Sequence, residues 1–397
     1  MKRTISAALL LTVLLTGCSL PALRTEQAVG PREQNDLYAA QTQRQADTYQ
    51  PALMACSSPE LWAREQLEPD LQAVYDQLND IAARRSDEPV DVDISQDQVR
   101  LCLTALWADH PEYFWFDGEG TYSTASTPLL GDSTSVTLSY TLSVEEIDGL
   151  IPQVDAFTAA CFQSIAGAES DYEKILGVYR YLIENTDYVL DVQDQSMICL
   201  MTQHRATCAG YAKSFQYLMH QLGIPCTLAL GTGKGGENHG WNIVKCGGDW
   251  YQVDVTWGDP VDENGNPGTS LDYTYFMLTD EEMYRDHTLD SALPVPVCTA
   301  TTYNYYRQSG LQLSSWDSVS YESLLRNAAA QGDGWLLVRF DRREDYDAAI
   351  RALIDQGGIM TVLENCGLTV PDSGITYSRN DTFLEFSVQL PQPGALH

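Results

Sequence analysis

The segment from Ala206 to Ala212 reads ATCAGYA, and it places Cys208 directly before a run of apolar side chains. These apolar side chains recur at helical spacing: Tyr211, Phe215, Leu218, Met219 and Leu222. Gly223 and Pro225 end the pattern. A helix is therefore expected to begin close to Cys208, where the positive end of its dipole favours the thiolate form of the side chain.

A β-hairpin is expected just downstream, because Gly247-Gly248 is a strong signal for a two-residue turn. Pairing residue 246 with residue 249 sets residue 239 opposite 256 and residue 241 opposite 254. One face of the hairpin then carries four side chains: His239, Trp241, Asp254 and Thr256. His239 and Asp254 become diagonal neighbours, roughly 7 Å apart or less at Cβ. A register shifted by one residue would put Asp254 on the opposite face.

A thiol, an imidazole and a carboxylate thus occur in this order: Cys208, His239 and Asp254. Nucleophilic catalysis by cysteine needs these three groups. Cys208 would attack a carbonyl carbon, His239 would take and later return a proton, and Asp254 would fix the tautomer of the imidazole. The sequence therefore predicts an enzyme.

Further residues are candidates for the surroundings of this site. The backbone N–H at the start of the helix is the natural first donor to an oxyanion, and Gln203 and Tyr188 are weak candidates for a second donor. Trp241 would shield the site from water. Gly210, which allows close approach of backbone or substrate, and Tyr211 would complete its wall.

No cofactor or metal ion is expected. The sequence has no CxxC motif and no Cys/His cluster with zinc spacing. The segment 259–265 reads DPVDENG, but Pro260 breaks the register of a calcium loop, so a polar turn is favoured.

The first residues resemble a bacterial lipoprotein signal. Lys2 and Arg3 precede an apolar run from Ile5 to Leu15 that is too short to span a membrane. The segment ends in Leu-Thr-Gly-Cys18, which resembles a lipobox whose cysteine is acylated. An ordinary secretory signal followed by a coincidental cysteine is the alternative. Both readings place the mature protein outside the cytoplasm, and residues 18–57, poor in large aliphatic side chains, would form a flexible tether.

The net charge of −32 limits the kinds of molecule that this protein is expected to bind. A surface this acidic would be repelled by phosphate backbones, which argues against nucleic acid as a partner. Substrates would be neutral or cationic, unless the charge serves only solubility. Besides Cys18 and Cys208, eight cysteines remain, and the sequence leaves their pairing open.

Three folded parts are expected after the tether. An α+β unit over residues 58–168 contains a helix signal near residue 58, a capping box formed by Ser95 and Gln98, and alternation typical of a strand over 136–142. Residues 169–298 form the catalytic part, which begins with a helix at Asp171. Residues 299–397 form a small α/β unit with helices over 322–330 and 344–356 and a strand over 335–340.

Four motifs carry a resemblance to a known family: CAGYA at 208–212, LGIP at 222–225, HGWN at 239–242 and WYQVDVTW at 250–257. Together they resemble the bacterial transglutaminase-like superfamily over about residues 170–290. The resemblance implies an α+β, papain-like cysteine fold, with the Cys helix packed on an antiparallel sheet that bears His and Asp. It also implies the triad Cys208, His239 and Asp254. Ala206 and Ala209 stand where relatives often have Gly and Glu, which puts the substrate subsites in doubt.

The resulting expectation is a membrane-tethered, extracytoplasmic enzyme that transfers acyl groups through a thioester. It would act on extracellular or cell-wall peptides as a protease-like hydrolase or a transglutaminase. One alternative is a scaffold or binding lipoprotein that keeps the fold without catalysis. Another is a substrate-binding lipoprotein of a transporter, which would not require the hairpin.

Overall fold

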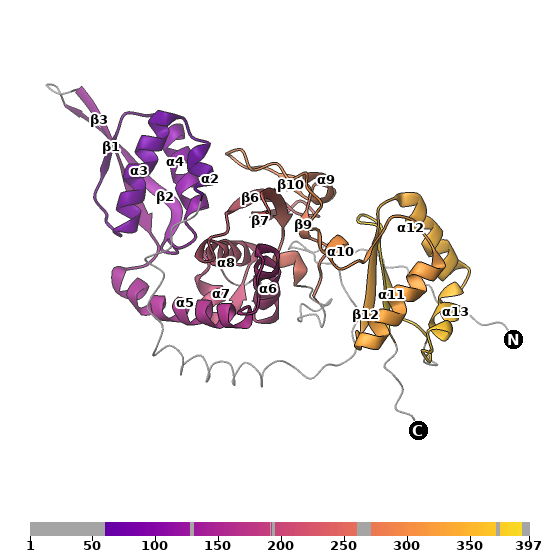
Figure 1. The fold of residues 1–397 in the computed structure, drawn as a ribbon. Coiled ribbons are helices and arrows are strands. Elements are labelled where there is room, and N and C mark those ends of the chain that lie inside the picture. Colours follow the sequence, from indigo (N-terminus) through magenta and orange to yellow (C-terminus); the bar gives the residue numbers. More distant parts are fainter. Residues whose placement is uncertain are drawn as a thin grey trace.

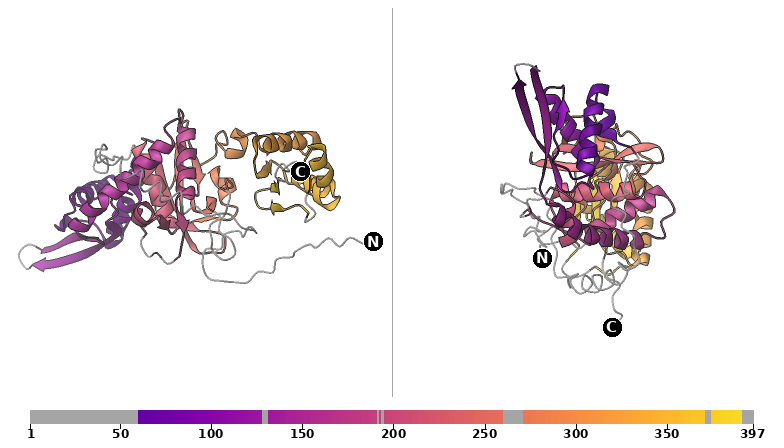
Figure 2. Two further views of the ribbon diagram at one scale, coloured as in Figure 1. Left: turned by 90° about the horizontal axis from the view of Figure 1, so that it is seen from below. Right: turned by 90° about the vertical axis from the view of Figure 1, so that its left-hand side faces the viewer.

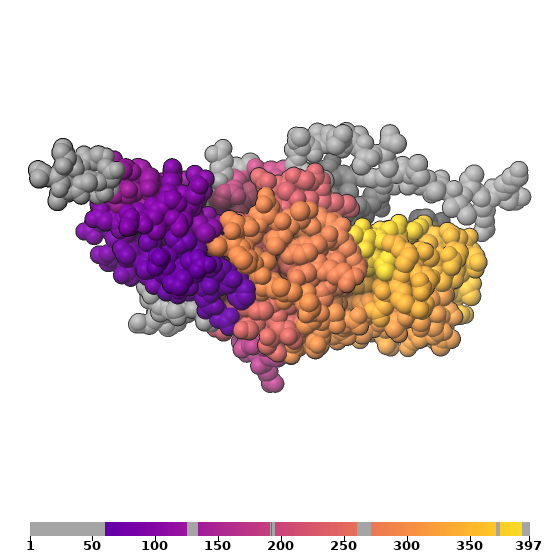
Figure 3. Space-filling model, turned by 90° about the horizontal axis from the view of Figure 1, so that it is seen from above, coloured from indigo at the N-terminus to yellow at the C-terminus, as the bar shows by residue number. Residues whose placement is uncertain are grey.

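The computed structural model describes residues 60–127, 131–190, 192, 195–259, 271–370 and 374–390. They form three units that lie in a row in chain order (Figures 1, 2 and 3). The signal segment, Cys18, the tether, Cys56 and loop residues 260–265 lie outside the described residues. In the part that is described, no helix is both long and apolar enough to cross a membrane.

The N-terminal unit packs helices against a three-stranded antiparallel sheet of order β1-β3-β2. Its elements are α2 (Trp62–Glu65), α3 (Pro69–Ala83), β1 (Val90–Val92), α4 (Gln96–Asp109), β2 (Phe116–Thr127) and β3 (Gly131–Tyr140). The expected capping box is present, because the Ser95 side chain accepts the Gln98 N–H and Gln98 reaches back to the Ser95 N–H. The helix expected from residue 58 is divided in two, since Pro69 occupies the first turn of α3.

The central unit begins with a layer of helices. Its members are α5 (Val144–Ser164), α6 (Asp171–Glu184), α7 (Ile198–Gln203) and α8 (Cys208–Gln221), with the short parallel pair β4 (Asp187–Tyr188) and β5 (Arg205–Ala206). The helix expected at Asp171 is confirmed, with Ser170 as its N-cap. Phe157 of α5 packs its ring on Tyr181 of α6, so α5 joins this layer.

A five-stranded antiparallel sheet lies against these helices, in the order β10-β6-β7-β8-β9. Its strands are β6 (Cys226–Thr232), β7 (Asn238–Cys246), β8 (Asp249–Val253), β9 (Phe276–Leu278) and β10 (Thr288–Leu289). The expected hairpin register is confirmed, because Cys246 pairs with Asp249. The ladder ends at the pair Asn242–Val253, so the expected pairs 239–256 and 241–254 are wrong. Thr256 lies instead in a 3-10 turn, η3 (Thr256–Gly258).

The C-terminal unit has its own core and a four-stranded sheet of order β11-β12-β14-β13. It contains β11 (Gln312–Leu313), α11 (Ser318–Gln331), β12 (Trp335–Phe340), α12 (Arg343–Ile350), α13 (Gly358–Asn365), β13 (Tyr377–Asn380) and β14 (Glu385–Gln389), preceded by α10 (Tyr305–Gln308). The expected strand 335–340 is confirmed. The helix expected to reach residue 356 changes to π-helical geometry over Arg351–Asp355.

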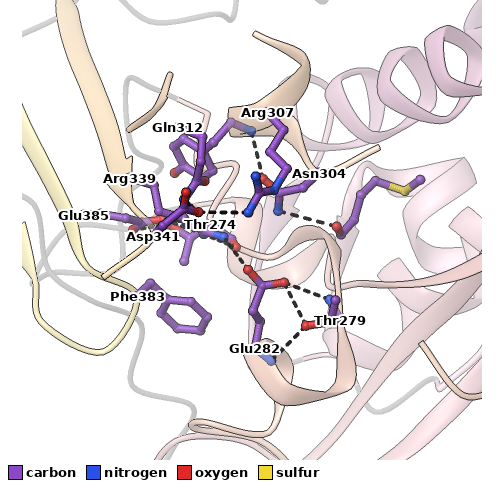
Figure 4. A network of polar contacts seen from close by, with 12 residues as sticks. Thr274, Thr279, Glu282, Asn304, Arg307, Gln312, Arg339, Asp341, Phe383 and Glu385 are labelled. Atoms are coloured by element: carbon purple, nitrogen blue, oxygen red, sulfur yellow. Dashed lines mark hydrogen bonds and ion pairs between the residues drawn. The ribbon is translucent and has the colours of Figure 1, made fainter. Parts of the chain in front are cut away.

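Polar contacts join the C-terminal unit to the central unit (Figure 4). The Arg339 guanidinium on β12 lies 2.6 Å from Glu385 of β14 and donates to the Thr274 carbonyl of the central unit at 2.7 Å. The Thr274 hydroxyl in turn donates to Glu385 at 2.8 Å. These side chains are buried, so the contact is a closed interface rather than a flexible junction.

Candidate active site

Cys208 is the first residue of α8, as predicted. Thr207 is the extended residue before the helix, and Cys208 itself is half-buried. The N–H groups of a first helical turn make no hydrogen bond within the helix, and the positive end of the helix dipole lies there. The thiol therefore lies where a helix can stabilise negative charge.

Contacts along α8 show how the helix runs over the sheet. The Asn242 amide on β7 donates to the Ala212 carbonyl at 3.0 Å, and His220, near the end of α8, lies 2.8 Å from the Cys226 carbonyl. Cys226 pairs with Val244 in the sheet, so α8 and β7 run in the same direction. Their N-terminal ends, with Cys208 and His239, consequently lie at the same end of this helix–sheet pair.

His239 and Asp254 form a direct, buried contact. His239 Nε2 lies 2.6 Å from Asp254 Oδ2, and both side chains are fully buried. An ionised carboxylate only accepts hydrogen bonds, so this contact assigns the imidazole proton to Nε2. The nitrogen that remains for a thiol is Nδ1. The predicted contact between His239 and Asp254 is thus formed, although Asp254 lies just beyond the end of β8.

Several contacts hold the Asp254 carboxylate. Its Oδ1 accepts the Trp257 N–H at 3.2 Å, and its own N–H donates to the Tyr275 carbonyl at 3.0 Å. Burial alone would raise the pKa of Asp254, but the charges and hydrogen bonds of His239 and His287 outweigh it and lower the pKa. Asp254 is therefore ionised near neutral pH, as an orienter must be.

Aromatic rings enclose His239. Trp241 lies nearly parallel to the imidazole with ring centroids 6.1 Å apart, and Trp257 lies at 5.8 Å. Gly233, in the turn between β6 and β7, also lies against this site, because a Cβ there would be 3.7 Å from the His239 ring. These apolar neighbours exclude water from the His239–Asp254 contact, which strengthens it.

His287 joins the same cluster, and the sequence analysis missed it. Its Nε2 lies 3.1 Å from Asp254 Oδ2, and its Nδ1 lies 2.8 Å from Asp286 Oδ1. No periodic pattern links position 287 to position 254, since His287 follows the short helix α9 (Asp280–Met283) in an irregular segment. Only the adjacent Asp-His pair in the sequence hinted at it.

One group of three possible metal ligands occurs among the described residues: His239, Asp254 and His287, with donor atoms within 4.8 Å of one another. Two ligands on one tetrahedral zinc ion, each about 2.0–2.1 Å from the metal, lie roughly 3.3 Å apart. The 2.6 Å contact between His239 and Asp254 is shorter than that and fits a hydrogen bond. We therefore assign this cluster to hydrogen bonding.

The predicted wall residues have specific positions. Trp241 is buried, and its indole N–H donates to Gln252 at 2.6 Å. Gly210 allows α8 to pack closely, because a Cβ there would lie 2.8 Å from the Ala206 Cβ. Tyr211 is fully buried, with its hydroxyl 2.6 Å from the Asp259 carboxylate. Gly210 and Tyr211 thus support the start of α8 from within the core.

The two weak oxyanion candidates differ in their exposure to solvent. The Gln203 side chain is exposed at the end of α7, with its amide 3.8 Å from Cys199 Sγ. Tyr188 is buried in β4, with its ring 6.5 Å from the Tyr211 ring. Gln203 therefore remains the candidate with a solvent-exposed amide, and Tyr188 belongs to the packing around Tyr211.

The described cysteines form no disulfide with one another. Most are buried in apolar surroundings, where a thiol packs as a small hydrophobic group. Burial raises the pKa of Cys102 to about 11 and that of Cys246 to about 12. Such thiols are poor nucleophiles at neutral pH, which distinguishes them chemically from a half-buried cysteine at a helix start.

Comparison with known proteins agrees with this geometry. Residues 159–255 match the family model of the transglutaminase-like superfamily. This match shows a transglutaminase-like domain within the chain, and in the structure this region combines helices with an antiparallel sheet. The match covers the helix that begins with Cys208, the strand with His239, and Asp254.

Individual relatives are more distant. The chain is 26% identical over 143 residues to the kyphoscoliosis peptidase of Mus musculus and 27% identical over 143 residues to that of Homo sapiens. Each alignment covers 31% of this chain and 22% of the relative, so the chain spans about a fifth of the length of these relatives.

Two solved structures are also similar. One, described as a TGase, has 13% identity and a TM-score of 0.26, covering 43% of this chain and 51% of that one. The other, from Cytophaga hutchinsonii and described as a candidate cysteine protease, has 18% identity and a TM-score of 0.24, covering 35% of this chain and 62% of that one.

Proposed function

We propose that this protein is a cysteine acyl-transfer enzyme in which Cys208, His239 and Asp254 form the catalytic triad. The observation that carries the proposal is the buried 2.6 Å contact between His239 and Asp254, at the same end of the sheet as the start of α8. The transglutaminase-like match over this region adds support. A scaffold that only kept the fold would not need all three groups.

The proposed reaction has two steps. The Cys208 thiolate attacks the carbonyl carbon of an amide, the C–N bond breaks, and the leaving amine takes its proton from His239 Nδ1. A thioester on Cys208 results. Water or a primary amine then attacks the thioester, His239 takes the proton of the attacking group, and the thiol is restored. The second nucleophile decides between hydrolysis and transglutamination.

The substrates that we propose are extracellular or cell-wall peptides or glutamine side chains. We also propose that acylated Cys18 tethers the enzyme to the outer face of the cell membrane through residues 18–57. The lipobox-like segment and the composition of the tether support this placement. The relatives described as peptidases favour peptides as the substrate class.

A thiol-reactive peptide library tests the proposal. We expect the wild-type protein to be labelled at Cys208 with clear preferences among peptides, and Cys208→Ala to lose this labelling. The preferred peptide is then offered as an amide. Without an added primary amine it should be hydrolysed to the acid, and with the amine it should give a new amide. Labelling of Cys208 without sequence preference, and no product from any amide, would favour the non-catalytic scaffold.

A further inference from the structure

His287 is a buried histidine held between two carboxylates. Its Nε2 lies 3.1 Å from Asp254 Oδ2, and its Nδ1 lies 2.8 Å from Asp286 Oδ1. The His287 side chain is fully buried, and that of Asp286 is 7% exposed. Both ring nitrogens therefore face an oxygen acceptor in a place that water does not reach.

This geometry fixes the protonation state of His287. A neutral imidazole has one N–H, so one of the two contacts would set a nitrogen lone pair against a carboxylate oxygen. Both contacts are hydrogen bonds only when His287 is an imidazolium. The other oxygen of this carboxylate, Asp286 Oδ2, accepts a hydrogen bond from the Tyr275 hydroxyl at 2.8 Å.

The groups that face His287 favour its charged form on balance. Burial lowers the pKa of His287, but hydrogen bonds to Asp254 and Asp286 outweigh burial, and the pKa is raised above its ordinary value. The nearby imidazole of His239, with ring centroids 5.5 Å apart, acts in the opposite direction. His287 also contacts the aromatic rings of Trp241, Trp257 and Tyr275, which carry no charge of either sign.

We propose that His287 is a positioning residue for the candidate triad: as a buried imidazolium, it fixes the Asp254 carboxylate and offsets part of its charge. His239 and His287 share the same oxygen, Asp254 Oδ2. With only His239 beside it, the Asp254 carboxylate would stabilise the His239 imidazolium more strongly. With a second cation on the same oxygen, the His239 imidazolium releases its Nδ1 proton closer to neutral pH, as a general acid and base must. This inference rests on the proposed function.

The pH dependence of Cys208 alkylation tests the proposal. Iodoacetamide is added to the folded, full-length protein, which is then digested with trypsin. The fragment 206–213 contains Cys208 and no other cysteine, so its mass reports alkylation at that position alone. The step in the pH profile that disappears in His239→Ala belongs to His239.

Two variants change the environment of His239 without touching it. In His287→Gln a neutral amide replaces the cation, and the step that belongs to His239 should move to higher pH by on the order of one unit. Asp286→Asn keeps His287 but removes its second carboxylate, so the step should move in the same direction by less.

His110→Gln is the matched control. His110 is also buried and lies 2.7 Å from a carboxylate, that of Glu112, but it belongs to the N-terminal unit. Its loss should leave the His239 step where it is. If His287→Gln does not fold, Asp286→Asn decides the question alone.

The outcomes are distinct. A His239 step that is present in the wild type and stays in place in both variants would overturn the positioning role and leave the proposed function standing. A wild-type profile without any step that depends on His239 would overturn the proposed function, and this inference with it.

Discussion

Asp259 shows how burial changes the chemistry of a single residue near the candidate site. It follows η3, is 5% exposed, and accepts a hydrogen bond from Tyr211 of α8 at 2.6 Å. Burial raises the pKa of Asp259 to about 7, the hydrogen bond from Tyr211 opposes this, and the charge of Asp187 adds to it. Asp259 is therefore protonated in the folded protein over a range of pH in which an unfolded aspartate is ionised.

The sign of the effect on stability follows from proton binding. Between about pH 4 and about pH 7 the folded state holds a proton on Asp259 that the unfolded chain has lost, so stability falls as pH rises through this window. Asp259→Asn has no carboxyl group here to titrate, so this pH dependence should disappear. From about pH 4 to about pH 7, the free energy of unfolding of the variant should rise by on the order of 3 kcal/mol relative to that of the wild type. Thermal unfolding at several pH values measures it. Asp249→Asn, at an exposed carboxylate, is the control, and an equal pH dependence for both variants would contradict the account.

At the scale of elements, helix α8 and the β7–β8 hairpin could be predicted because local residues determine them. Apolar spacing and Gly223 define α8, and Gly247-Gly248 fixes the turn, with φ values of 61° and 96° that favour glycine. The structure confirms both elements, and with them the contact of His239 with Asp254.

Other parts of these elements could not be predicted. The ladder ends at Val253, because the Asp254 N–H bonds to Tyr275 and its carboxylate to the Trp257 N–H, and Tyr275 is distant in sequence. The place of His287 depends on the irregular chain after α9. Such contacts depend on the tertiary arrangement, which neither periodicity nor turn chemistry encodes.

At the scale of the whole molecule, the C-terminal unit reaches the back of the candidate site. Phe383 packs on Tyr275 with ring centroids 5.1 Å apart, and Tyr275 packs in turn on Trp257 and on His287. Figure 4 shows Phe383 beside the polar network around Arg339. The C-terminal unit therefore supports the aromatic enclosure of His239 through one intermediate layer.

Arg339→Met should weaken this docking. The change leaves the buried Glu385 carboxylate without its cation, and breaking a buried pair in this way costs about 3–5 kcal/mol. Denaturant unfolding measures the loss, and limited proteolysis should show earlier cleavage of the C-terminal unit. Arg326→Met removes an exposed arginine that pairs with Glu322 at 3.6 Å and should cost less than ~1 kcal/mol. Equal losses in the two variants would show that the interface does not depend on Arg339.

The proposed function depends on activation of Cys208 by His239. Iodoacetamide alkylation of fragment 206–213 at about pH 6.5 measures this activation directly, with the synthetic peptide of the same sequence as the reference for an ordinary thiol. We expect Cys208 in the folded protein to react at least about tenfold faster than the peptide, and His239→Ala to remove this difference. Equal rates for the folded protein and the peptide, unchanged in His239→Ala, would contradict the proposed function.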